Sequence, residues 1–204
     1  MWFATILLLS FLFAFQSDRH TDLSDSVRIG PESSITVKGS STLHDWDAVS
    51  TSIQLRAQVP QGWFRSDRAW SAEELKGIEA NVPVESLESG RNKMNRDLRK
   101  ALRSEQHPEI SFRSLGADQI SFNEDSSRFE FRINGSLSIA GEQRDIPFTC
   151  TMDSREDQRI HTLCETEINM TDFGVQPPTA FFGVLKTDER VTVTVDLTLL
   201  PVER

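Results

Sequence analysis

The chain has 204 residues, of which 37% are hydrophobic and 26% charged, and it carries a net charge of −9. This composition is typical of a folded globular protein, and the length suits one domain. The negative charge argues against nucleic-acid binding, which needs a basic surface, and against general adhesion to anionic membranes.

The N-terminal segment is apolar and uncharged from Trp2 to Phe15. A run of about fourteen apolar residues is short for a membrane-spanning helix and typical of a signal-peptide core. Residues 1–17 are therefore predicted to be a signal peptide, which implies a periplasmic or secreted protein. The alternative is an uncleaved N-terminal anchor. The polar residues 18–32 are expected to form a loose leader before a single domain over residues 33–204.

Most of the remaining chain alternates between apolar and polar residues, which is the period of a β-strand with one dry face. The clearest case is 129–139, and similar strands are expected at 35–46, 49–57, 78–84, 110–112, 120–122, 146–152, 160–168 and 191–199. Residues 59–73 follow no clear pattern. The inward-facing set is predicted to be Val37, Trp46, Ile53, Leu55, Ile78, Val82, Phe112, Phe129, Phe131, Ile133, Leu137, Phe148, Val193 and Val195, joined by Phe173, Phe181 and Phe182 from the loop at 171–187.

These segments amount to about eight strands, so the pattern predicts an all-β fold, an extended antiparallel eight-stranded barrel with one amphipathic helix. Eight strands close into a barrel just wide enough for side chains or one small ligand, and closure removes exposed sheet edges. The inward residues then line either a ligand-binding lumen or an ordinary filled core. Alternation does not distinguish the two, because both need a dry face.

The period changes to that of a helix between Gly90 and Pro108. One face holds Met94, Leu98, Ala101 and Leu102, and the opposite face holds Arg96, Arg99, Lys100 and Arg103. We expect this helix at the barrel mouth, where the four cations could meet an anionic head group such as a pyrophosphate, since Arg suits bidentate phosphate contact. The alternative is a solvated basic surface.

The two cysteines fall on neighbouring strands that are joined by a polar turn. A hairpin centred near residue 157 places Cys150 opposite Cys164 on the dry face. A disulfide there would close a loop of about 15 residues and add roughly 3 kcal/mol of stability. Two buried free thiols are the alternative. No C-x-x-C spacing supports redox catalysis, and no metal is expected at either cysteine.

No residue pattern predicts catalysis. The sequence His44-Asp45-Trp46-Asp47 fits a metal or acid–base site, but also a turn in which Trp46 closes the barrel end. There is no Ser-His-Asp or H-x-x-x-H spacing, so no catalytic residue, metal or cofactor is predicted.

Several motifs in order along the chain resemble those of one family, the YceI-like polyisoprenoid-binding proteins. They are the segment at 39–46, the segments at 82–90, 95–99 and 107–112, the glycine-flanked strand at 135–141, the segment at 170–175 and the final alternating strand. Together they extend over roughly residues 33–200, which is far more specific than any single motif.

The resemblance implies a lipocalin-like barrel, exported from a bacterial cell, that holds a polyisoprenoid or another amphipathic lipid without catalysis. Two alternatives remain, an interaction scaffold with a filled barrel and an enzyme that acts on a small apolar substrate. The sequence leaves open whether two copies associate into a homodimer.

Overall fold

The computed structural model describes residues 24–64, 71–123, 128–154, 158–177, 179–180 and 185–202. Its strands are β1 (Ser24–Ile29), β2 (Ser34–Ser41), β3 (Trp46–Ser50), β4 (Gln54–Arg56), β5 (Gln58–Pro60), β6 (Glu79–Pro83), β7 (Glu109–Asn123), β8 (Arg128–Ile139), β9 (Glu142–Ser154), β10 (Ile160–Asn169), β11 (Thr179–Ala180) and β12 (Leu185–Pro201). The helical elements are α1 (Asn92–Ala101) and three short 3₁₀ helices, η1 (Ala72–Leu75), η2 (Val84–Ser86) and η3 (Met170–Phe173).

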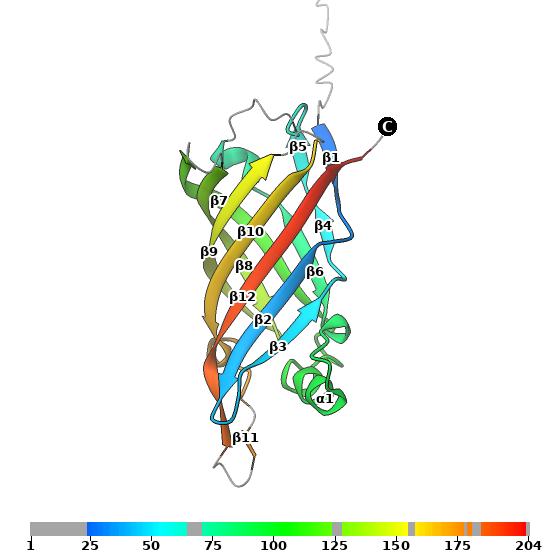
Figure 1. Ribbon diagram of the computed structural model, residues 1–204, viewed down its shortest axis with the longest axis vertical. Coiled ribbons are helices and arrows are strands. Elements are labelled where there is room, and N and C mark those ends of the chain that lie inside the picture. Colours follow the sequence, from blue (N-terminus) through cyan, green and yellow to red (C-terminus); the bar gives the residue numbers. More distant parts are fainter. Residues whose placement is uncertain are drawn as a thin grey trace, which may run out of the picture.

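The strands form one curled antiparallel sheet whose two edges belong to the same stretch of chain (Figure 1). Hydrogen-bonded neighbours run in the order β3-β2-β12-β10-β9-β8-β7-β6-β4. β3 and β4 are consecutive in sequence, and β5, which follows them, pairs with β1. The segment from β3 to β5 therefore closes the barrel.

Eight ribbons make up this barrel, as the sequence pattern predicted, if each ribbon is counted as one strand or as consecutive short strands that continue one another. β1 and β2 both pair with β12 and form one interrupted ribbon. β3, β4 and β5 form a second interrupted ribbon, and β6, β7, β8, β9, β10 and β12 supply one each. The short β11 is an added hairpin arm that pairs with the beginning of β12. Interruptions and bulges in the long strands thus account for the larger number of assigned strands.

Inward and outward residues alternate along β8 as expected, with Phe131, Ile133, Leu137 and Ile139 buried. The segment from β3 to β5 departs from a single strand over 49–57, in which Val49 would share the inward face of Ile53 and Leu55. Ala48 and Ser50 are instead the buried residues of β3, whereas Leu55 of β4 faces the lumen. The inward-facing positions therefore change from even-numbered residues in β3 to odd-numbered residues in β4. This change occurs because the chain bends between the two strands, where it stops pairing with β2 and begins to pair with β6.

Gly135 breaks the alternation of large apolar residues in β8 for a packing reason. A Cβ atom at this position would lie 2.1 Å from Cζ of Phe112 on the neighbouring strand β7. The Phe112 ring therefore occupies the space above the glycine and meets Phe148 edge-on, with ring centroids 5.4 Å apart. The missing side chain lets two large rings pack across β7, β8 and β9.

Two segments that the sequence pattern left outside the strands help to close one end of the barrel. Residues 24–29 were predicted as part of a loose leader, but they form β1, paired with β12 and β5. Only Val27 and Ile29 alternate there, which is too short a signal to indicate a strand. Beyond β5, Trp63 and Phe64 are 1% and 4% exposed and belong to the main buried cluster.

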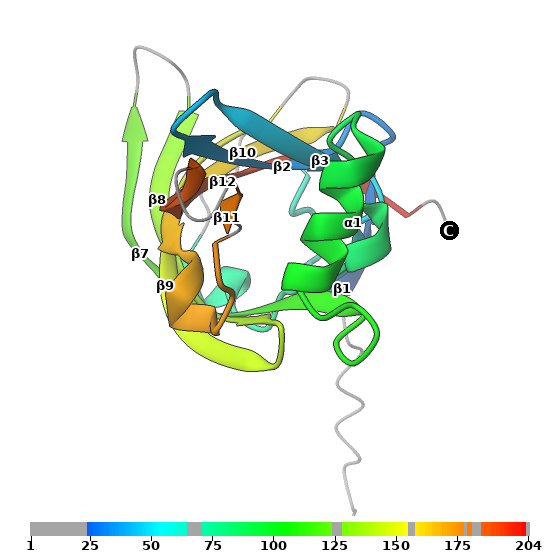
Figure 2. The same ribbon diagram turned by 90° about the horizontal axis from the view of Figure 1, so that it is seen from below.

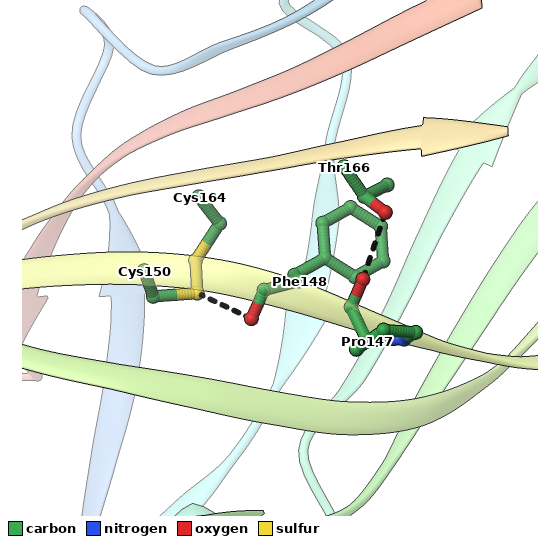
Figure 3. The surroundings of a disulfide bond; sticks show 5 residues. All are labelled: Pro147, Phe148, Cys150, Cys164 and Thr166. Carbon is green, nitrogen blue, oxygen red and sulfur yellow. Dashed lines mark hydrogen bonds between the residues drawn. A yellow bond between two sulfur atoms is a disulfide. The ribbon is translucent and has the colours of Figure 1, made fainter. Parts of the chain in front are cut away.

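Cys150 and Cys164 form a disulfide between β9 and β10, as the hairpin prediction placed them (Figure 3). The two residues are direct register partners, with Cα atoms 4.1 Å apart. Close by, the Thr166 hydroxyl donates a hydrogen bond of 2.7 Å to the Pro147 carbonyl, which also joins the two strands (Figure 3). The disulfide therefore ties the hairpin together on its inward face.

Replacing both cysteines, as Cys150→Ala with Cys164→Ala, should lower the free energy of unfolding by about 3 kcal/mol, because the unfolded chain gains freedom when the loop opens. Chemical denaturation of both proteins without reductant measures the difference. Reductant should weaken the natural chain by a similar amount and leave the double variant unchanged. A loss below about 1 kcal/mol would contradict a stabilising disulfide.

Candidate functional site

A long apolar cavity of about 590 Å³ runs through the barrel. Along β12 its lining extends from Thr187 to Leu199, which is about 40 Å of strand at roughly 3.3 Å per residue. With a strand tilt of about 35–45°, the lumen is about 30 Å long. This size lies in the usual range of small-molecule sites, and the elongated shape favours a chain-like ligand.

Most of the predicted inward residues line this cavity. They are Val37, Trp46, Ile53, Leu55, Ile78, Val82, Phe112, Phe131, Ile133, Leu137, Phe148, Phe173, Val193 and Val195. Phe129 was also predicted to face the lumen, but it is not part of the lining. Its ring packs against Phe122 near the β7–β8 turn, with ring centroids 4.9 Å apart. Phe181 and Phe182 lie outside the described residues.

Several inward-facing residues of β12 and β2 are only half-buried although the barrel surrounds them. Val37, Val193 and Val195 all line the cavity and all keep part of their surface accessible. In a filled core these side chains would be covered by their neighbours. Together with the cavity, this exposure indicates open space inside the barrel instead of a completely filled core.

The helix α1 lies at the end of the barrel opposite β5 (Figures 1 and 2). The helix lies at the mouth as expected, and its apolar face, Met94, Leu98, Ala101 and the following Leu102, lines the cavity. Buried Asn95 fixes the helix to the preceding segment, because its side-chain oxygen accepts hydrogen bonds from the Ser89 amide at 2.9 Å and the Ser89 hydroxyl at 2.6 Å. The helix thus forms one wall of the mouth.

The four predicted head-group residues are not part of the cavity lining. Arg99 pairs with Glu85 at 2.8 Å, and Arg103 donates a hydrogen bond of 3.0 Å to the Gly174 carbonyl. Arg96 and Lys100 are exposed. The cations lie opposite the apolar face, as the helical period required, but that apolar face points into the lumen. Two of them hold the helix to the barrel, and the structure gives none of them access to a ligand in the cavity.

The charged residues that do line the mouth are already paired with each other or with a neighbour. Arg91 Nη1 lies 2.8 Å from Nε2 of His44, at the tip of the β2–β3 hairpin. Lys93 Nζ lies 2.7 Å from Oδ2 of Asp97, one turn further along α1. Exposed Leu43 completes this rim. His44 therefore belongs to a hairpin turn at the mouth.

Two polar side-chain atoms next to the lumen have no hydrogen-bond partner among the described residues. They are the hydroxyl of Thr162 on β10 and the indole Nε1 of Trp46 on β3. Thr162 is 8% exposed, whereas Trp46 is half-buried and lies over Gly39 near the mouth. The alternation had placed Thr162 inward, but only the absence of a partner singles it out.

The charged clusters of the barrel wall lie outside the cavity lining. His161 Nε2 is 2.8 Å from Asp196, on the face of β10 opposite Cys164. Arg132 and Asn134 hydrogen bond to Asp118 and lower the pKa of that carboxyl. Across the residues that the structure describes, no group of three metal-ligating side chains occurs, and no helix in them is long and apolar enough to span a membrane.

Sequence reasoning missed lining residues where the strand pattern was weak or broken. Val27 lies in the segment taken as a leader, Trp63 lies within the stretch at 59–73 that followed no clear pattern, and Leu75 comes just after that stretch. Arg91, the N-cap of α1, and Lys93 in its first turn also line the cavity. Arg91 is about 60° from Met94 on the helical wheel, which could have indicated a mouth cation, whereas Lys93 falls beside Lys100 and gave no such signal.

A family model described as the YceI-like domain matches residues 20–199. Among solved structures, Burkholderia cenocepacia BcnA is similar, with a TM-score of 0.64 and 12% identity over 84% of this chain and 99% of that one. A polyisoprenoid binding domain from Saccharophagus degradans, implicated in plant cell wall breakdown, has a TM-score of 0.62 and 12% identity over 88% and 99%. A Campylobacter jejuni YceI protein has a TM-score of 0.52 and 14% identity over 65% and 76%. No curated protein matches the chain.

Proposed function

The chain belongs to the YceI-like family, and from this premise we propose that it is an exported carrier that holds one long apolar lipid in its barrel. An isoprenoid chain is the favoured ligand. The observation that carries the proposal is the open apolar lumen, in which inward valines keep accessible surface. The solved structure described as a polyisoprenoid binding domain shares the fold and supports the ligand class.

Burial of apolar area would supply the binding free energy, at about 25 cal/mol per Å² removed from water. The lining is almost entirely aliphatic and aromatic, so it offers area and shape instead of directional contacts. An extended chain in a lumen about 30 Å long suits this arrangement. A compact polar molecule would leave most of the lining without contact.

Binding without catalysis agrees best with where the charged residues lie. Among the described residues, the ionisable side chains of the cavity lining are His44, Arg91, Lys93 and Asp97, all at the mouth, and an enzyme needs a nucleophile or a proton-transferring group beside its substrate. An interaction scaffold with a filled barrel agrees less well, because the lumen is open.

Export is part of the same proposal. The apolar segment at 2–15 has the character of a signal-peptide core, and it lies outside the described residues. The Cys150–Cys164 disulfide supports an oxidising compartment such as the periplasm, since disulfides rarely persist in a reducing cytosol.

A photoreactive isoprenoid alcohol that carries a diazirine on its chain tests the binding site directly. Irradiation of its complex with the chain should label inward residues of β8 and β12, such as Phe131 and Val193, and spare their outward neighbours Arg132 and Thr192. Peptide mass spectrometry identifies the labelled positions. Labelling confined to outward residues or to the exposed face of α1 would contradict a lipid held in the lumen.

A further inference from the structure

Beside the apolar lumen lies a hydroxyl that has almost no accessible surface and that no described residue satisfies. Thr162 lines the cavity at 8% exposure, and its Oγ1 has no hydrogen-bond partner. It is in register with Met152 of β9 and Leu197 of β12, two residues from fully buried Ile160. The beginning of β10 lies at the end of the barrel away from α1 (Figure 1), so the hydroxyl belongs to the closed end.

A buried hydroxyl without a partner is unfavourable, because it has lost its hydrogen bonds to water. Rotation of the Thr162 side chain would bring this hydroxyl to the surface of the lumen, where a ligand oxygen or nitrogen would restore one hydrogen bond. A purely hydrocarbon ligand would leave the hydroxyl unpaired and exclude water from it. The closed end therefore selects for a ligand with a hydrogen-bonding atom.

The hydrogen-bonding atom of the ligand belongs to a neutral group. Among the described residues, the charged side chains that line the cavity are at the mouth, and each has a neighbour within hydrogen-bonding distance. A phosphate or carboxylate moved to the closed end would lose its hydration and find no cation among the described residues that line it. An alcohol, ketone or amide would lose much less hydration free energy than these charged groups.

We propose that the barrel takes its lipid polar end first. The ligand is then a single-chain lipid whose neutral head hydrogen bonds to Thr162, with the hydrocarbon tail directed toward α1 and exposed Leu43. This inference rests on the proposed function and adds the chemistry and direction of the ligand. It also explains why the mouth cations need no ligand partner.

The opposite direction would place the head near Trp46, whose Nε1 also has no partner. Trp46 is in register with Gly39, which pairs with Val191 of β12, whereas Thr162 pairs with Leu197. The two levels are thus about 20 Å apart along β12, at roughly 3.3 Å per residue. Substitutions at the two positions therefore distinguish the two directions. The deeper burial of Thr162 favours the closed end.

The test compares hexadecanol with hexadecane, which have the same chain and differ by one hydroxyl. Each is titrated against a fluorescent naphthylamine bound to the purified chain. Thr162→Val should weaken hexadecanol about fivefold, the effect of one neutral hydrogen bond, and leave hexadecane unchanged or slightly tighter. Trp46→Phe should change both affinities by the same factor. Thr192→Val, on the outward face of β12, is the matched control and should change neither.

The possible outcomes distinguish a wrong binding direction from a wrong proposed function. An equal effect of Thr162→Val on both probes, or an alcohol-specific loss in Trp46→Phe, would overturn the polar-end-first direction while leaving a lipid-binding lumen. Failure of both probes to bind the natural chain would overturn the proposed function and this inference with it. Because valine matches threonine in shape and removes an unpaired hydroxyl, thermal melting should show a variant at least as stable as the natural chain.

Discussion

Ala80→Trp should weaken the binding of a long-chain lipid by roughly 100-fold while the barrel remains folded. Ala80 lies on β6, lines the cavity and is only half-buried, so an indole ring there has open lumen to enter. If the ring displaces about 120 Å² of buried chain, the loss is about 3 kcal/mol, or roughly 100-fold in affinity. Displacement titration with hexadecanol measures the change.

The matched control is Asn81→Trp, which adds the same ring to the next residue of β6. Asn81 pairs with Ser111 and Gln54 on the outward face, so this variant should bind lipid like the natural chain. Circular dichroism and thermal melting establish that both variants are folded. Full lipid affinity in a folded Ala80→Trp protein would contradict a ligand site inside the barrel.

Trp63→Ala should lower the free energy of unfolding by about 3–5 kcal/mol, the usual cost of removing a large buried aromatic side chain. Trp63 is 1% exposed and packs edge-on against Phe64, with ring centroids 5.6 Å apart. It also lines the closed end of the cavity, so its loss leaves a void that the barrel wall cannot fill.

Denaturant titration of Trp63→Ala beside Trp63→Phe measures this contribution. The phenylalanine variant keeps a ring in the same place, so its free energy of unfolding should fall by less than half of the decrease seen for the alanine variant. A cost below about 1 kcal/mol for the alanine variant would show that the closed end is not packed as the structure describes.

The barrel could be predicted from the sequence because strands with one dry face have a simple period. Phe131, Ile133 and Leu137 fixed the phase of the longest strand, and the two cysteines fixed the register of a hairpin. The helix at 90–108 was equally clear, since its apolar residues recur on one face. In each case, local spacing alone determined which side chains share a face.

The rest of the site depends on contacts between segments that are distant in sequence. β1 is held by β12 and β5, and its own alternation covers only Val27 and Ile29. The helix sequence shows that its cations lie opposite its apolar face, but not that the apolar face lines the lumen. The partners of Arg99 and Arg103 lie in other parts of the chain, so their structural role could not be predicted from the helical pattern.

Native mass spectrometry of the chain, exported and purified from a bacterial host, tests the lipid-carrier account most directly. The spectrum should show one bound molecule per chain, and organic extraction should release a neutral single-chain lipid, such as an isoprenoid alcohol. A spectrum of the bare protein, with no uptake when such lipids are offered in excess, would contradict the account and leave the open lumen without a ligand.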